Sequence, residues 1–129
     1  MRIAAIDIGT NSLHMIVCRV RPDLSFEVVG REKDMVRVGT GSLGGRRLAE
    51  ASMSARIQTL SKFTRIAASH GVDEIVAAAT SAVREAENGG DFVAAVRRAV
   101  GLRVQVISGS EEARLIHLAA AYATHLGKR

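Results

Sequence analysis

The residue types and spacing best suited to chemistry lie near the start of the chain, between Asp7 and Ser12. An apolar run ends at the Asp7 carboxylate, and Gly9 then lets the backbone turn sharply without a Cβ clash. The backbone N–H groups of such a turn form a concave, positive surface that suits phosphate. Asp7 is itself an anion, so it fits beside phosphate only with a hard cation such as Mg²⁺ between them. The alternative interpretation is a plain β-hairpin in which Asp7 and Asn11 serve only as turn formers.

Two acids near the other end of the chain, Glu111 and Glu112, are candidates for moving a proton. Ser108 and Glu111 fit a capping box, and acids in the first turn of a helix complement its dipole by roughly 0.3–1 kcal/mol each. Capping accounts for Glu111 and leaves Glu112 without a structural role. A carboxylate at such a junction between strand and helix is suited to accept a proton from a water aligned behind a phosphorus atom.

Arg84 is the candidate cation for a transferring phosphoryl group, where catalysis rests mainly on positioning and electrostatics. The alternative is an exposed helical arginine that pairs with Glu85 or Glu87. Thr80 and Ser81 follow an apolar run and are suited to cap the short helix that carries Arg84.

Other familiar binding motifs are incomplete or missing from the sequence. Gly39–Gly44 satisfies the G-x-G-x-x-G pattern, but Arg31–Arg37 before it is too charged for a buried parallel strand, and the next strand does not end in an acid. We therefore expect a crossover loop over Gly39–Gly45 and no dinucleotide site. The sequence has no G-x-x-x-x-G-K-[ST] motif and no zinc-ligand spacing. The four scattered histidines are His14, His70, His117 and His125.

The composition indicates a globular domain whose charge favours anionic partners. The chain has 129 residues, 47% of them hydrophobic, and a mean hydropathy of +0.13, which suits one domain with one core. Eighteen basic residues against thirteen acids give a net charge of +5 and a pI near 10.3, which favours polyanions. Aromatic residues make up only 3%, too few for a platform that stacks single-stranded nucleic acid. No apolar run reaches the roughly 18 residues of a membrane span, and Cys18 is the single cysteine, so we expect a cytoplasmic protein.

Hydrophobic periodicity predicts five strands and four helices. The expected strands are Ile3–Ile8, Leu13–Val20, Ser25–Val36, Val72–Ala79 and Arg103–Ile107. The expected helices are Leu48–His70, the short one with Arg84, Phe92–Val100 and Glu111–Leu126. The long helix is expected to bury a stripe formed by Met53, Ile57, Leu60, Phe63 and Ala67. Gly71 suits its end, Asn88–Gly90 is expected to break the chain, Asp91 to cap the next helix and Gly101 to end it.

The order of these elements predicts the fold. Short turns make the first three strands antiparallel, and helical crossovers make the last two parallel to the first. We therefore expect a single α/β domain over residues 1–129, a ribonuclease H-like mixed five-stranded sheet with helices on both faces. The carboxyl ends of the first, fourth and fifth strands then share one edge, where ligands bind in open α/β sheets. Asp7, Thr80, Ser81 and the segment 108–112 fall at this edge.

Three segments resemble the exopolyphosphatase/guanosine pentaphosphate phosphohydrolase (Ppx/GppA) family of the sugar kinase/Hsp70/actin superfamily. They are DIGTNSLHM (Asp7–Met15), ATSAVREA (Ala79–Ala86) and ISGSEEARLI (Ile107–Ile116), and the resemblance runs through nearly the whole chain. It implies Mg²⁺-dependent removal of terminal phosphate from inorganic polyphosphate or from guanosine pentaphosphate. These anions are then the expected partners, with a homodimer left open and with no DNA or membrane partner.

The resemblance also implies a role for each matched residue. Glu112, the second acid of EEAR, matches the family's catalytic base, and Arg84 matches the arginine that steadies the phosphoryl group. Asp7 is expected to help place Mg²⁺. The expected phosphate-binding residues are Gly9, Thr10, Asn11, Ser12, Thr80, Ser81 and Gly109.

The family pattern also contains a second lobe that closes the phosphate site from the opposite side. We therefore expect the sequence to be the first lobe of a two-lobed phosphatase, which folds alone and has little activity by itself. Two other function classes stay open. One is an ATP-binding kinase or ATPase lobe of the same superfamily, and the other is a non-catalytic sensor of polyanions or nucleotides.

Overall fold

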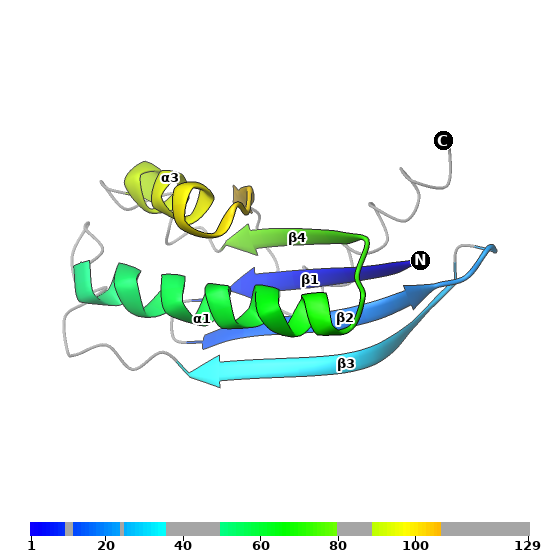
Figure 1. The fold of residues 1–129 in the computed structure, drawn as a ribbon. Helices are drawn as coiled ribbons and strands as arrows, with labels where there is room; N and C mark the ends of the chain where they lie inside the picture. Colours follow the sequence, from blue (N-terminus) through cyan, green and yellow to red (C-terminus); the bar gives the residue numbers. More distant parts are fainter. Residues whose placement is uncertain (10–11, 24, 36–49, 80–88, 107–129) are drawn as a thin grey trace.

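Five strands form one mixed sheet with the order β3-β2-β1-β4-β5 (Figure 1). The computed structural model describes residues 1–9, 12–23, 25–35, 50–79 and 89–106. The strands are β1 Arg2–Ile8, β2 Ser12–Val20, β3 Phe26–Met35, β4 Glu74–Ala79 and β5 Val104–Val106, and the described helices are α1 Glu50–Ser69 and α3 Gly89–Val100. The pairs β1–β2 and β2–β3 are antiparallel, whereas β1–β4 and β4–β5 are parallel. This topology confirms the predicted sheet, with β3 at its edge.

Side chains alternate between the two faces of the sheet along each strand, and each face contains a cluster of buried apolar residues. We call the face that carries α1 and α3 the helix face and the other one the far face. On the helix face, one cluster joins the strands to both helices through Ile6, Ile8, Leu13, Met15, Leu60, Phe63, Phe92 and Val96. On the far face, a second cluster is formed by Ile3, Ala5, Ile16, Cys18, Val20, Val76 and Ala78. The predicted helix Glu111–Leu126 and the short helix with Arg84 lie outside the described residues.

Helix α1 buries a stripe that differs by one position from the expected one. Leu60 and Phe63 are fully buried, as predicted, but Met53 and Ile57 are only partly buried. Arg56 is the residue that continues the stripe toward the start of α1, and only 3% of it is exposed. Leu60 is four positions after Arg56, so both lie on one side of the helix. The apolar pattern favoured Ile57 because hydrophobicity alone cannot identify a buried guanidinium.

The ends of the helices follow the predicted glycines. Gly71, just after α1, has φ +67° and Gly101, just after α3, has φ +80°, and both values favour glycine. The prediction that Asn88–Gly90 breaks the chain is wrong for Gly89 and Gly90, because α3 begins at Gly89. Asp91 therefore stands within the first turn of α3, where its charge still complements the helix dipole.

Contacts at Arg2 show how α1 is aligned with the sheet. The Arg2 Nη1 atom donates to the His70 carbonyl at 2.7 Å, and the Arg2 backbone N–H donates to Asp73 Oδ2 at 2.9 Å. The end of α1 therefore lies beside the start of β1. The start of α1 lies toward the opposite edge of the sheet, where β1 and β4 end (Figure 1). We use the term carboxyl edge for this side of the sheet, which is formed by the carboxyl ends of β1 and β4 and is distinct from the edge strand β3.

Within the described residues, neither α1 nor α3 is long and apolar enough to cross a membrane.

Candidate functional site

Asp7 lies close to the carboxyl edge, where β1 ends and β2 begins. Ile8 pairs with Leu13, and the Gly9 N–H extends this ladder by donating to the Ser12 carbonyl at 2.8 Å. Only residues 10 and 11 connect the two strands, and both lie outside the described residues. In this structure the Gly9 N–H belongs to the hairpin ladder, so the contribution of Gly9 visible here is to close the turn.

Asp7 is a fully buried acid one residue before the end of β1. None of its surface is exposed, and it lies on the far face, like Ala5 of the same strand. Its partners across the sheet are His14 of β2 and Ala78 of β4. A buried carboxylate is costly unless it is hydrogen-bonded or paired. Asp7, Ser12 and His14 each have an interaction partner in the structure.

The chemistry of the Asp7 carboxylate can be compared with what a Mg²⁺ ion requires. Among the described residues, no group of three or more His, Cys, Asp or Glu side chains could hold a metal ion. Mg²⁺ usually keeps several waters and binds through one or two carboxylates and the phosphates of a substrate. A single buried carboxylate beside a polar turn therefore suits Mg²⁺.

The ends of three strands are level at the carboxyl edge. Ile8 pairs with Ala79, and Ala79 pairs with Val106, so these residues form one row across β1, β4 and β5. The predicted edge is thus present, and the chain leaves it directly before the expected site segments. Seven predicted site residues lie outside the described residues: Thr10, Asn11, Thr80, Ser81, Arg84, Gly109 and Glu112. Their roles stay predictions.

His14 is a neighbour of Asp7 that the motif analysis did not identify. The four histidines are scattered along the sequence, and His14 is opposite Asp7 only through the pairing of β1 with β2. A two-residue connection at positions 10 and 11 pairs Gly9 with Ser12 and therefore Asp7 with His14. Counting back from the turn was the signal that could have found this pair.

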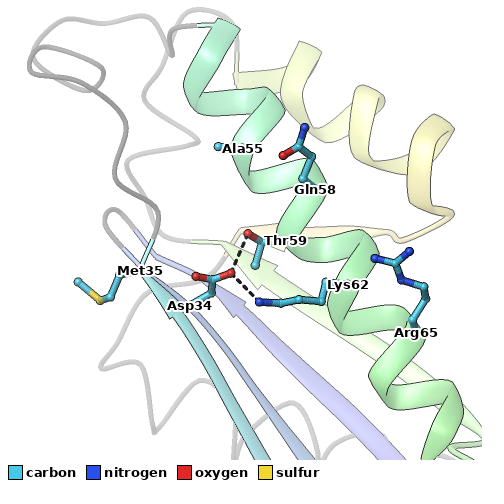
Figure 2. A pocket seen from close by; sticks show the side chains of 7 residues that line it. All are labelled: Asp34, Met35, Ala55, Gln58, Thr59, Lys62 and Arg65. Atoms are coloured by element: carbon cyan, nitrogen blue, oxygen red, sulfur yellow. Dashed lines mark hydrogen bonds and ion pairs between the residues drawn. The ribbon is translucent and has the colours of Figure 1, made fainter.

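A second polar cluster lies on the helix face at the same edge (Figure 2). Asp34 of β3 accepts hydrogen bonds from Thr59 Oγ1 at 3.2 Å and from Lys62 Nζ at 2.9 Å, both on α1. The hydrogen bond and charge of Lys62 lower the pKa of Asp34, with a smaller contribution from Thr59. The side chains surround an open pocket of about 370 Å³ lined by Asp34, Met35, Ala55, Gln58, Thr59, Lys62 and Arg65.

The Asp34 pocket is separate from the Asp7 site. Asp34 pairs with Leu13, which belongs to the helix face, whereas Asp7 and His14 lie on the far face. The sheet itself therefore stands between the two carboxylates. The contacts of Asp34 connect the edge strand to α1, which is a structural role.

Known proteins with similar sequences and structures indicate the family to which this chain is related. A model of the Ppx/GppA phosphatase family matches residues 6–129. Exopolyphosphatase 1 of Mycobacterium leprae (strain TN) is 33% identical over 119 residues, which are 92% of this chain and 35% of that protein. The crystal structure of the Aquifex aeolicus Ppx/GppA family member superposes with a TM-score of 0.78 at 33% identity, over 95% of this chain and 40% of that one. This chain therefore spans little more than a third of the length of such relatives.

A more distant match supports the fold alone. RuvC of T. thermophilus superposes with a TM-score of 0.54 at 11% identity, over 98% of this chain and 94% of that one. Together with the strand order, these matches confirm the ribonuclease H-like, actin-like architecture predicted from the sequence.

Proposed function

This chain belongs to the Ppx/GppA phosphatase family, and we propose that it forms the first lobe of a Mg²⁺-dependent hydrolase of terminal phosphoanhydride bonds. The observation that carries the proposal is the buried Asp7 carboxylate beside a closed turn at the carboxyl edge, within the segment that the family model matches. Asp7 would hold Mg²⁺. When bound, Mg²⁺ would supply positive charge that offsets the negative charge of the phosphate.

The substrates we propose are inorganic polyphosphate and guanosine pentaphosphate. The M. leprae relative is named an exopolyphosphatase, and the net charge of +5 favours a polyanion. The turn residues Gly9, Thr10, Asn11 and Ser12, with Thr80, Ser81 and Gly109 after the next strands, would surround the phosphate. A homodimer and a cytoplasmic location remain predictions.

The proposed reaction is an in-line displacement at the terminal phosphorus. A water oxygen forms the new bond to phosphorus while the bond from phosphorus to the bridging oxygen breaks, and the shortened chain leaves with that electron pair. Glu112 would accept a proton from the water, and Arg84 would neutralise charge on the phosphoryl oxygens. Orthophosphate and a substrate shorter by one phosphate are the products.

Phosphate release from polyphosphate and from guanosine pentaphosphate, measured with and without Mg²⁺ on the protein that contains both lobes, tests this function. Glu112→Gln should lower kcat by about 10²–10⁴-fold with little change in KM, because only the proton acceptor is lost. Asp7→Asn should lower activity and raise the Mg²⁺ concentration needed for half-maximal rate. Asp34→Asn is the matched control, since its carboxylate lies at the same edge on the other face, and its activity should stay within about twofold of the wild type.

Three results would contradict the proposal. Wild-type turnover by Glu112→Gln would remove the proton acceptor from the mechanism. Faster phosphoryl transfer from ATP to an acceptor alcohol than phosphate release from polyphosphate would favour the kinase alternative. Tight polyanion binding with no Mg²⁺-dependent release by the protein that contains both lobes would favour a sensor.

A further inference from the structure

Strand β3 sorts its charged side chains by sign between the two faces of the sheet. Its segment 31–34 reads Arg, Glu, Lys, Asp, so the sign of the charge alternates along the chain. Arg31 pairs with Ile16 of the far-face cluster, so Arg31 and Lys33 lie on the far face. Glu32 and Asp34 alternate with them and lie on the helix face. A segment without net charge therefore places its two cations on one face and its two acids on the other.

The contacts of this segment also differ between the two faces. On the helix face, Asp34 accepts hydrogen bonds from Thr59 Oγ1 at 3.2 Å and from Lys62 Nζ at 2.9 Å. On the far face, Arg31 and Lys33 are both exposed, and no hydrogen bond or ion pair among the described residues involves either side chain. Within the described part of the chain, the two cations are therefore available to an anionic ligand.

The electrostatics of the far face agree with this placement. Burial raises the pKa of the Cys18 thiol, and the charge of Arg31 lowers it by a smaller amount, so the guanidinium lies near this far-face residue. Among the described strand residues on this face, the acids are Asp7, which is fully buried, and Glu74, which lies at the start of β4 and remote from the carboxyl edge. The exposed part of the far face beside β3 is therefore positively charged.

Lys33 lies in the same row of the sheet as Asp7. The pairing registers connect Lys33 to His14 and His14 to Asp7. Neighbouring strands are about 4.8 Å apart, so about 10 Å separates the backbone of Lys33 from that of Asp7. Arg31 lies two residues further from the carboxyl edge, about 7 Å along the same strand. A chain of linked phosphates that begins at the carboxyl edge beside Asp7 can therefore contact both cations along the far face.

We propose that Arg31 and Lys33 form a binding surface for the non-terminal phosphates of an inorganic polyphosphate chain. Its use during catalysis rests on the proposed function, whereas the affinity for the polyanion does not. A guanidinium is suited to bidentate contacts with phosphate oxygens, and a lysine supplies a point charge on a flexible stem. Charged side chains on an edge strand also discourage pairing with another chain, but either sign serves that purpose. The sorting of the cations onto the face of Asp7 is what indicates an anionic ligand.

Binding of inorganic polyphosphate in the presence of EDTA, measured on the protein that contains both lobes, tests the surface without Mg²⁺. Arg31→Gln/Lys33→Gln should weaken binding by about 3–30-fold at low salt. The logarithm of the affinity should also depend less steeply on the logarithm of the salt concentration, by about 1–2 in slope, because two phosphate contacts are lost. Arg31→Lys/Lys33→Arg keeps both charges and should bind within about threefold of the wild type.

Arg97→Gln/Arg98→Gln is the matched control. It removes the same charge from two exposed positions in the last turn of α3, which packs on the helix face. Both double variants change the net charge of the protein equally, so a general effect of charge would weaken binding equally in the two. The affinity of the control should stay within about twofold of the wild type, because salt screens charges that are distant from the bound chain.

Activity assays with Mg²⁺ on the same protein test the role of the surface toward the substrate. Arg31→Gln/Lys33→Gln should raise KM for long polyphosphate by about 3–30-fold and leave kcat unchanged, because contacts remote from the reacting phosphorus are the same in the substrate complex and the transition state. KM for guanosine pentaphosphate should change less, since this substrate has fewer phosphates behind the terminal one.

The outcomes separate this inference from the proposed function. Wild-type affinity and salt dependence in Arg31→Gln/Lys33→Gln would overturn the inference, as would an equal loss in Arg97→Gln/Arg98→Gln. A loss of affinity for single-stranded RNA with unchanged affinity for polyphosphate would overturn it as well. If Arg31→Gln/Lys33→Gln loses polyphosphate affinity while the wild type releases no phosphate with Mg²⁺, the surface stands and the proposed function fails.

Discussion

Gly30→Ala is expected to destabilise the contact between the edge strand β3 and the end of α1. The His70 ring lies over Gly30, and a Cβ atom at position 30 would lie 3.1 Å from His70 Cε1 and 3.2 Å from His70 Nε2. Favourable contacts between carbon atoms have separations of about 3.5–4.0 Å, so the ring would have to move by several tenths of an ångström. Its backbone resists a shift because the His70 carbonyl accepts a hydrogen bond from Arg2 Nη1 at 2.7 Å.

The size of the effect follows from two opposing contributions to the free energy of unfolding. Overpacking of this kind typically costs about 1–3 kcal/mol. Gly30 does not have a positive φ, so alanine can adopt its backbone conformation. Replacing glycine by alanine then restricts the unfolded chain and contributes about 0.4–1 kcal/mol in the other direction. The net loss should be about 1 kcal/mol, which lowers Tm by about 4 °C in a domain of this size.

A double-mutant cycle measured by chemical denaturation isolates the ring as the cause. In a His70→Ala background the overpacking disappears, so Gly30→Ala should become stabilising by about 0.4–1 kcal/mol. The sign of the Gly30→Ala effect is therefore expected to reverse between the two backgrounds. An equal loss of stability in both backgrounds would refute the reasoning, because the ring would then not be the obstacle.

Two further predictions concern buried and paired side chains. Burial raises the pKa of the Cys18 thiol, and the charge of Arg31 has a smaller opposite effect. Ellman's reagent should therefore label one thiol per chain in denaturant and almost none under native conditions. Rapid labelling of the native protein would contradict the burial of Cys18. The lowered pKa of Asp34 means that its bonds to Lys62 and Thr59 stabilise the fold above the ordinary aspartate value of 3.8 and lose this effect as the pH falls through the folded pKa. The side chains of Asp34 and Lys62 are both partly exposed, so their pairing is expected to contribute little. In denaturation at several pH values, the wild type should lose about 0.2–0.5 kcal/mol more than Asp34→Asn on acidification, and identical profiles would contradict the pairing.

Most of the fold could be predicted from the sequence because independent local signals agree. The apolar run of β1, the apolar pattern of β2 and the two glycines after α1 and α3 each specify a boundary or a face without any long-range information. The prediction errors occur at residues whose burial depends on neighbours that are distant in the sequence. Arg56 is buried on α1 although its residue type favours exposure, and burial lowers the pKa of its guanidinium. The hydrophobic pattern of the sequence does not reveal which group lies close enough to interact with a buried guanidinium.

The candidate site was predictable in its position along the chain but not in its neighbours. Asp7 could be assigned to the end of a strand because an acid follows an apolar run and precedes a glycine. The partner strand of that acid becomes visible only when the turn length is used to align β1 with β2. Motifs along the sequence identify Asp7, whereas His14 becomes its neighbour only through strand pairing.

Register also explains why the two carboxylates at the carboxyl edge, Asp7 and Asp34, lie on opposite faces of the sheet. Asp34, Leu13 and Ile8 form one row, and the next row is formed by Lys33, His14 and Asp7. Adjacent rows face opposite sides of a sheet, so a shift of β3 by a single residue would exchange the faces of Asp34 and Lys33. The contacts of Asp34 with Thr59 and Lys62 oppose that shift, because they require its carboxylate to face α1. The pairing on the helix face therefore helps to keep Lys33, and not a second acid, in the row of Asp7.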